Sequence, residues 1–202
     1  MTTQRRLVLA SASPARLSLL RQAGLAPEVV VSRVDESAVR APRVAEQVAL
    51  LAAAKAAEVA KNEKDALVIG ADSLLEFSGK PLGKPADAAE ARERWRRMSG
   101  HSGILHTGQA LFDVQDGSVV SRDIAVASTV VYFASPTPQE LEAYLATGEP
   151  LAVAGAFTLD GLGSPFVRRV EGDPAAVVGL SLTLLRTQLS KRGLAITDLW
   201  RR

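Results

Sequence analysis

A short serine-rich turn near the start of the chain combines two hydroxyl groups with a guanidinium. Ser11, Ser13 and Arg16 follow the apolar residues 7–9, and Pro14 comes directly after Ser13. Serine before proline is typical of a helix start, where the first backbone N–H groups have no partner within the helix. These N–H groups, the hydroxyls and the guanidinium can converge on one anion, and phosphate is the obvious candidate. A plain capped helix with a solvated Arg16 is the alternative.

An aspartate stands at the end of a second apolar run. Residues 66–71 are apolar or glycine, and Asp72 follows them. In open α/β sheets, ligands bind beyond the carboxyl ends of buried strands, so an acidic residue at such an end is well placed for catalysis. Asp72 is therefore the carboxylate that we expect to act. An aspartate that only caps a turn is the alternative.

Three more charged residues could contribute to a site. Glu36 lies in a polar loop, and Lys55 lies within an alanine-rich segment at 42–61. Lys84 lies in the segment 79–85, whose glycines and prolines are typical of a flexible active-site flap. For Lys55, a solvated surface lysine is the alternative. Carboxylates with a hard divalent cation and basic residues form a set suited to hydrolysing phosphoanhydrides.

Several other chemistries lack their residues or their spacing in this sequence. The chain has no cysteine, which excludes disulfides, thiol catalysis and zinc–thiolate sites. Its two histidines, His101 and His106, show no metal-binding or Ser/His/Asp pattern, and we expect both at the surface or in turns. Walker and Rossmann glycine motifs are also absent.

Charge and hydropathy limit the partners. The formal net charge is +2, the basic residues are scattered, and aromatic residues make up 4% of the chain. Nucleic-acid polymers are bound by dense basic stripes with aromatics, so we expect no nucleic acid polymer as a partner. No stretch approaches the roughly 20 apolar residues of a membrane helix, and the apolar run after the first six residues is too short for a signal peptide. We therefore expect no membrane partner and a cytoplasmic location.

Apolar runs, capping patterns and turn signals predict one α/β domain over residues 1–202, with two lobes around a cleft. Strands are predicted at 7–9, 28–31, 66–72, 104–112, 119–133 and 166–170, with a hairpin turn across 115–117. Helices are predicted from Pro14, at 42–61, from Asp87 to Met98, at 138–147 and at 175–192.

Six segments of the chain, in this order, carry a resemblance to a known family: Ser11–Leu20, Gly70–Ser73, Leu82–Asp87, Ser99–Gly100, Gly155–Phe157 and Val178–Leu180. Together they resemble the Maf family of nucleoside triphosphate pyrophosphatases. The resemblance implies a Maf/ITPase-like α/β fold, with an elongated central mixed β-sheet flanked by helices. It also implies hydrolysis of a nucleoside triphosphate to the monophosphate and pyrophosphate, a divalent metal cation (Mg²⁺ or Mn²⁺), and a homodimer in the cytoplasm.

The resemblance assigns roles to residues at the matching positions. Ser13 and Arg16 bind the phosphates, with Ser11 beside them. Lys55 and Lys84 help to balance the negative charge of the phosphates. Cationic donors of this kind stabilise the negative charge of a triphosphate in the transition state.

Two carboxylates complete the site that the resemblance implies. Glu36 and Asp72 engage the metal and the attacking water, with Asp72 as the favoured general base. A carboxylate beside a cation stays ionised at neutral pH and can accept a proton from a metal-activated water.

Asp160 is a departure from the family pattern that bears on the choice of base. The dTTP/UTP branch usually has glutamine at this position, and the 7-methylguanosine triphosphate branch has glutamate. An ionised carboxylate only accepts hydrogen bonds, which suits the paired donors of guanine, whereas glutamine suits uracil or thymine. Leu151–Val153 also stands where the family has a lysine. The substrate is therefore left open between dTTP/UTP and 7-methyl-GTP-like nucleotides.

The family has also been associated with septum formation and cell division. A regulatory or binding protein without a dominant catalytic role is therefore the second hypothesis. The charges of Asp72, Lys84 and Arg16 favour the enzyme, because a scaffold would not need them.

Overall fold

The computed structural model describes residues 5–201, and within them the strands form one mixed sheet. The strand order is β2-β1-β3-β5-β6-β7, with β4 paired to β3. β1 is parallel to β2 and β3, whereas β4 and β7 are antiparallel to their neighbours. The strands are β1 Leu7–Leu9, β2 Glu28–Val29, β3 Ala66–Phe77, β4 Lys80–Leu82, β5 Ser102–Gln115, β6 Ser118–Phe133 and β7 Val167–Glu171.

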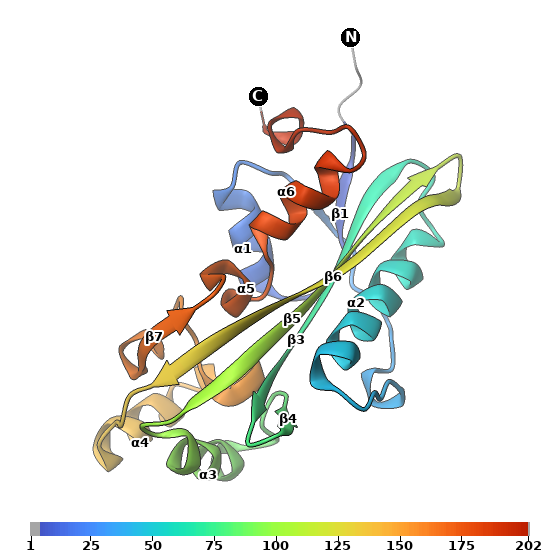
Figure 1. Cartoon of the computed structure of the whole chain (residues 1–202). Helices are drawn as coiled ribbons and strands as arrows, with labels where there is room; N and C mark the ends of the chain where they lie inside the picture. The colour runs from blue at the N-terminus through green and yellow to red at the C-terminus, as the bar shows by residue number, and fades with distance from the viewer. Residues whose placement is uncertain (1–4, 202) are drawn as a thin grey trace. The chain divides into compact units, whose positions relative to one another are not determined.

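Helices flank this sheet, so the α/β fold class is confirmed (Figure 1). They are α1 Pro14–Gln22, α2 Val44–Ala60, α3 Ala88–Met98, α4 Pro138–Ala146, α5 Pro174–Val178 and α6 Leu182–Ser190. Ser13, Asp87 and Thr137 cap α1, α3 and α4 with their side chains, as their sequence patterns predict. Among the residues that the structure describes, no helix is long and apolar enough to cross a membrane. The signal-peptide expectation falls partly on residues 1–4, which lie outside the described residues.

The chain divides into two compact units. The first comprises the chain up to Asp72, Thr107–Ala127 and the chain from Gly179 onward, and the second comprises Ser73–His106 and Ser128–Val178. The division agrees with the two lobes expected from the sequence. The cleft and the single domain over residues 1–202 stay predictions.

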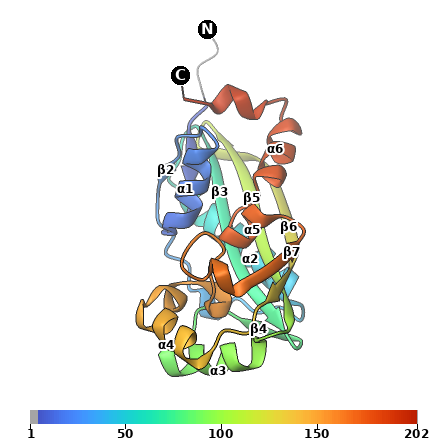
Figure 2. The same cartoon turned by 90° about the vertical axis from the view of Figure 1, so that its left-hand side faces the viewer.

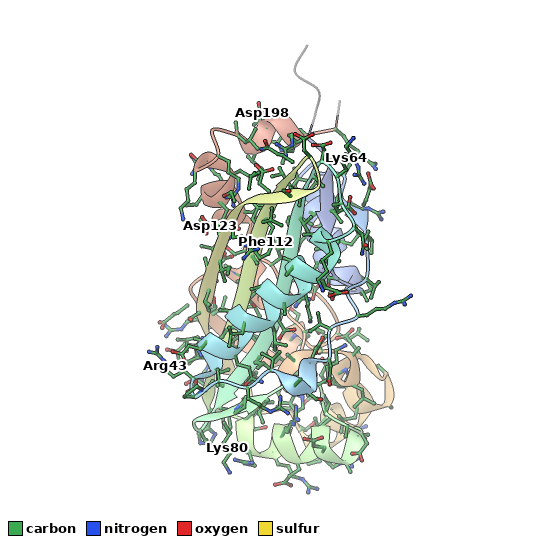
Figure 3. All side chains as sticks on the ribbon, turned by 90° about the vertical axis from the view of Figure 1, so that its right-hand side faces the viewer. Arg43, Lys64, Lys80, Phe112, Asp123 and Asp198 are labelled. Carbon is green, nitrogen blue, oxygen red and sulfur yellow. The ribbon has the colours of Figure 1, made fainter. Side chains whose placement is uncertain are left out.

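In the first unit, helices cover both faces of the strands. α1 and α6 pack on one face, where Leu20, Leu67 and Leu185 are buried together (Figure 2). α2 packs on the other face, and Phe112 of β5 lies on that face (Figure 3). The alternation of side chains along β3 therefore decides which residues face α2. Asp72, an even-numbered residue like Val68 of the α2-side core, lies on the face that α2 covers.

Two glycines let α2 approach the sheet closely. A β-carbon at Gly70 would touch the Ala52 carbonyl and lie 2.7 Å from the Ala56 nitrogen. A β-carbon at Gly108 would touch the Val48 carbonyl. Larger residues at either position would push the α2 backbone away from the strands.

The second unit has its own aromatic core. The Trp95 ring, buried on α3, makes edge contacts with Phe133, Tyr144 and Phe166. The Trp95 indole N–H donates to the Ala156 carbonyl at 2.7 Å, so the buried ring keeps its hydrogen bond. This core joins α3 and α4 to the ends of the long strands that belong to this unit.

Four predicted elements differ from the structure. The strand predicted to end at Asp72 continues to Phe77, because residues 75–77 pair with β4. The flap predicted at 79–85 contains β4, which forms a hairpin with β3 through a turn with positive φ angles. The strand predicted at 28–31 is confined to Glu28–Val29, at the sheet edge.

The helix predicted at 175–192 is two helices. Gly179, with a φ of +132°, ends the first helical segment, and Ser181 caps α6 with its hydroxyl. His106 also differs from its prediction, because it is buried and contacts Ser128 Oγ at 2.8 Å and Glu76 Oε2 at 3.1 Å. The hairpin predicted across 115–117 is confirmed, with positive φ at Asp116 and Gly117.

Replacing Gly70 with alanine is expected to lower the free energy of unfolding by about 3 kcal/mol, because the new β-carbon meets backbone atoms that cannot rotate away. Urea unfolding followed by circular dichroism measures the change. Gly83→Ala is the matched control, since its β-carbon would make only an ordinary 3.4 Å contact with Leu74. Equal stability of the two variants would contradict the close packing of α2 on β3.

Candidate active site

A buried lysine joins two carboxylates that come from different elements. Lys55 Nζ lies 2.6 Å from Asp72 Oδ1 and 2.7 Å from Glu36 Oε1. The side chains of Lys55 and Asp72 are 9% and 10% exposed, whereas that of Glu36 is 59% exposed. The solvated-lysine alternative for Lys55 is therefore wrong, because its charge is buried and paired on the inner face of α2.

The geometry follows from the packing of α2 on β3. Gly70 brings the backbone of α2 against β3, next to the helical turn that carries Lys55. Asp72 lies two residues after Gly70 on the same face of the strand, so its carboxylate meets the lysine. The alternative in which Asp72 only caps a turn is also wrong, because Asp72 lies within the strand.

Glu36 reaches Lys55 from a short 3₁₀ turn, Glu36–Ala38. The Asp35 carboxylate caps this turn by accepting hydrogen bonds from the backbone N–H and the hydroxyl of Ser37, at 2.9 and 2.6 Å. The Gln47 amide of α2 donates to the Val39 carbonyl at 3.2 Å. The turn is thus capped on the N-terminal side of Glu36 and held to α2 on its C-terminal side.

The serine-rich turn and Arg16 do meet, as the sequence predicts. Arg16 Nη1 donates to Ser11 Oγ at 3.0 Å, and the Ser13 N–H donates to the same oxygen at 3.2 Å. Ser13 Oγ in turn accepts from the Arg16 N–H at 3.4 Å, as a helix cap does. The alternative of a fully solvated Arg16 is wrong, since the guanidinium is held by protein groups.

Gly179 fixes the other side of Arg16, a role that no sequence pattern indicated. Arg16 Nε donates to the Gly179 carbonyl at 2.8 Å, and a β-carbon on Gly179 would lie 3.2 Å from that nitrogen. Gly179 was expected inside a helix, where its carbonyl would be used by the helix itself. Glycine followed two residues later by Ser181, a good cap before an apolar run, is the signal that could have revealed the break.

Burial and charge act against each other at this cluster. Burial raises the pKa of the Asp72 carboxyl above the usual range of aspartate, while the charge and hydrogen bond of Lys55 act to lower it. Burial lowers the pKa of the Arg16 guanidinium, while the negative charges of Asp72 and Glu36 oppose that change. The cluster therefore places two cations and two carboxylates within electrostatic reach of one another.

The donor set suits a hard divalent cation. Asp72 and Glu36 offer carboxylate oxygens close to the same nitrogen, and Mg²⁺ is commonly held by one or two carboxylates together with substrate phosphates. In the described part of the chain, no group of three or more His, Asp or Glu residues could hold a metal ion by itself. The residues thus fit a cation that is shared with a phosphate ligand.

Lys84 and Asp160 belong to the second unit, and both are exposed. Asp160 lies on a loop that the Glu149 carboxylate holds by accepting from the N–H groups of Leu162 and Gly163, each at 3.1 Å. The Lys55 cluster and the Arg16 turn belong to the first unit. The roles of Lys84 and Asp160 stay predictions.

Comparisons with known proteins point to one family. A family model described as "Maf-like protein" matches residues 6–192. Three curated relatives carry the name "Nucleoside triphosphate pyrophosphatase". They come from Streptomyces coelicolor (58% identity, 99% of this chain and 98% of the relative), Salinispora tropica (56%, 98% and 88%) and Streptomyces avermitilis (53%, 99% and 98%).

A solved structure is also similar. The "Nucleoside-triphosphatase / dITP/XTP pyrophosphatase" from Mycobacterium abscessus matches with a TM-score of 0.39 and 16% identity, over 73% of this chain and 96% of that one.

Replacing Lys55 with methionine is expected to raise the pKa of Asp72 further in metal-free protein, because Lys55 is the main influence that lowers it. Folding already raises this pKa, so the stability contributed by Asp72 is present below its unfolded-state pKa and is lost as the pH rises through the folded-state pKa. Lys55→Met therefore extends that loss to higher pH. Carbon NMR titration of the Asp72 carboxyl with a chelator present, and urea unfolding across acidic to neutral pH, measure the two effects.

Lys61→Met, at the C-terminal cap of the same helix, is the matched control, because Lys61 pairs with Glu58 at the surface. It is expected to leave the pKa of Asp72 unchanged. A pKa of Asp72 that stays constant or falls in Lys55→Met would contradict the electrostatic coupling described here.

Proposed function

The chain belongs to the Maf family, and from this premise we propose that it hydrolyses a nucleoside triphosphate to the nucleoside monophosphate and pyrophosphate. The observation that carries the proposal is the buried Lys55, which holds Asp72 and Glu36 together in the same unit as the Arg16 turn. A buried ion pair adds little stability over apolar packing, whereas buried charged groups with perturbed pKa values are typical of functional sites. The Arg16 turn adds the donors that a triphosphate needs.

The basic groups of the cluster bind and stabilise the phosphates. Arg16 is fixed at its Nε and Nη1 by protein acceptors, so it meets a phosphate without first losing side-chain freedom. The N-terminal turn of α1, which Ser13 caps, adds backbone N–H groups and the positive end of the helix dipole. Lys55 adds a second cation from α2. Donors that are fixed in advance stabilise the charge that develops on the reacting phosphate.

Asp72 accepts the proton of the attacking water. Its raised pKa makes it a stronger base than an exposed aspartate, while Lys55 keeps the carboxylate form accessible. Glu36 shares Lys55 and assists Asp72 in holding a divalent cation, Mg²⁺ or Mn²⁺. When bound, that cation supplies positive charge to the phosphates and makes the attacking water more acidic.

The remaining parts of the proposal rest on the sequence resemblance. Lys84 helps to balance the negative charge of the phosphates, and Asp160 selects the base of the nucleotide. A homodimer and a cytoplasmic location complete this proposal. The substrate class stays open between 7-methyl-GTP-like nucleotides, which the acceptor-only Asp160 favours, and dTTP or UTP, which the family's other branch uses.

A regulatory protein of septum formation and cell division, without dominant catalysis, is the second candidate. It requires neither a buried carboxylate with a raised pKa nor a paired lysine beside it. Turnover that depends on Asp72 decides between the two.

Replacing Asp72 with asparagine is expected to lower turnover by at least about 100-fold, because asparagine cannot accept the proton. Pyrophosphate release from nucleoside triphosphates with Mg²⁺ or Mn²⁺ measures it. Asp113→Asn is the matched control, since Asp113 is also buried in the first unit and paired with a cation, Arg5. Near-normal turnover in a folded Asp72→Asn protein would remove Asp72 as the general base, and no turnover by the unaltered protein on any nucleotide would favour the regulatory candidate.

A panel of dTTP, UTP, CTP, GTP and 7-methyl-GTP tests the role of Asp160. Guanine-type nucleotides are expected to be preferred, and Asp160→Gln is expected to shift preference toward dTTP and UTP, because glutamine both donates and accepts. The ratio of kcat/KM values measures the preference. Glu93→Gln, a change at an exposed carboxylate on α3, is the control and leaves the ratio unchanged. A preference of the unaltered protein for dTTP and UTP would overturn the role of Asp160 and leave the reaction class intact.

A further inference from the structure

A buried side chain of β5, Gln109, holds the Gly179–Ser181 turn in place. The Ser181 backbone N–H donates to Gln109 Oε1 at 3.0 Å, and Ser181 and Gln109 are 1% and 0% exposed. The Ser181 hydroxyl meanwhile caps α6 by accepting from the Leu184 N–H at 3.0 Å. The turn that presents the Gly179 carbonyl to Arg16 is therefore fixed both to β5 and to α6.

The chemistry of Ser181 dictates how the Gln109 amide is oriented. A backbone N–H can only donate, so Gln109 must present its oxygen to Ser181. Its NH₂ group then points the other way and needs an acceptor, because a buried polar group without a partner is costly. Gln188 Oε1 is that acceptor, at 2.9 Å.

The orientation of the Gln188 amide is also fixed, because the acceptors that it faces are backbone carbonyls, which cannot donate. Its NH₂ group donates to the Asp123 carbonyl at 3.2 Å and to the Gln109 carbonyl at 3.4 Å. Carbonyl oxygens only accept, so Gln188 must direct its NH₂ to them and its oxygen to Gln109. Donors and acceptors thus alternate without conflict from β6 through α6 and β5 to the turn.

We propose that the Gln109–Gln188 pair is a positioning device for Arg16, acting through Ser181 and the Gly179 carbonyl. The proposal rests on the proposed function, in which Arg16 binds the substrate phosphates. Neither glutamine takes part in the bonds of the Lys55 cluster or of the Ser11–Arg16 turn described above, so both are positioning residues rather than catalytic ones.

The physical reason is the short path from the amide pair to the guanidinium. Only Leu180 lies between the Gly179 carbonyl and the Ser181 N–H, and one hydrogen bond joins that carbonyl to Arg16 Nε. If Gln109 loses its oxygen, the buried Ser181 N–H has to move toward another acceptor, and Gly179 moves with it. A displacement of about 1 Å at a group that orients a substrate can cost up to about 100-fold in rate.

A variant that removes the amide but keeps the length of the side chain tests the proposal. Gln109→Met preserves an unbranched chain of similar size and removes the acceptor for Ser181. It is expected to lower kcat/KM for nucleoside triphosphate by about tenfold or more and to raise the Kd of inorganic pyrophosphate, measured by calorimetry with Mg²⁺, by a similar factor. Val114→Ala, which removes buried side-chain atoms of β5 on the face that α2 covers, is the control for lost packing. It is expected to lose stability and to keep both constants.

A double-mutant cycle separates positioning from general damage. In an Arg16→Ala background, Gln109→Met is expected to have almost no further effect on kcat/KM or on the Kd of pyrophosphate, because the group that it positions is gone. The same fold-loss in both backgrounds would overturn the proposal, as would unchanged constants in Gln109→Met alone. If Gln109→Met does not fold, Gln188→Met takes its place with the same expectations.

The same cycle distinguishes failure of this inference from failure of the proposed function. A protein without hydrolytic activity on any nucleotide would refute the proposed function, and pyrophosphate binding would still decide whether the glutamines act through Arg16. Activity that is normal in Arg16→Ala would refute the phosphate role of Arg16 and, with it, the purpose of the positioning pair.

Discussion

The ion pair between Lys55 and Asp72 is the interaction on which the rest of the site depends. Both side chains are almost fully buried, and a buried charge is tolerated only when it is paired and hydrogen-bonded. Separating them would leave an uncompensated charge between α2 and β3, which is more costly than never burying the pair. The pair therefore fixes where α2 lies along β3, and Glu36 is held in the same place by its own bond to Lys55.

Two different packing constraints place the groups of this site. On one face of the sheet, Gly70 and Gly108 let the α2 backbone come close enough for Lys55 to reach Asp72. On the other, the break at Gly179 releases a carbonyl from helical bonding and gives it to Arg16. The glycines are thus as important to the site as the charged residues, because they let the backbone take the positions that bring the charged groups together.

Local signals in the sequence predicted the local structure well, and non-local contacts explain what they missed. Ser13 followed by Pro14 correctly marked the start of α1, and Asp116 with Gly117 marked the hairpin turn. The pattern could not show that β3 continues past Asp72, since that depends on pairing with β4, nor that Lys55 is buried on an alanine-rich helix. The sequence pointed to five residues that all lie in the first unit, namely Ser11, Arg16, Glu36, Lys55 and Asp72. The role of Gly179 became clear only from its hydrogen bond with Arg16 in the structure.

A crystal structure of the Asp72→Asn protein with Mn²⁺ and an uncleaved nucleoside triphosphate would show where the phosphates and the cation bind. We expect the phosphates to contact Arg16 and the first turn of α1, and the cation to lie on Glu36 and residue 72. The same structure would show whether Lys84 meets a phosphate and Asp160 meets the base. A nucleotide bound away from Arg16 and the Lys55 pair would contradict the account.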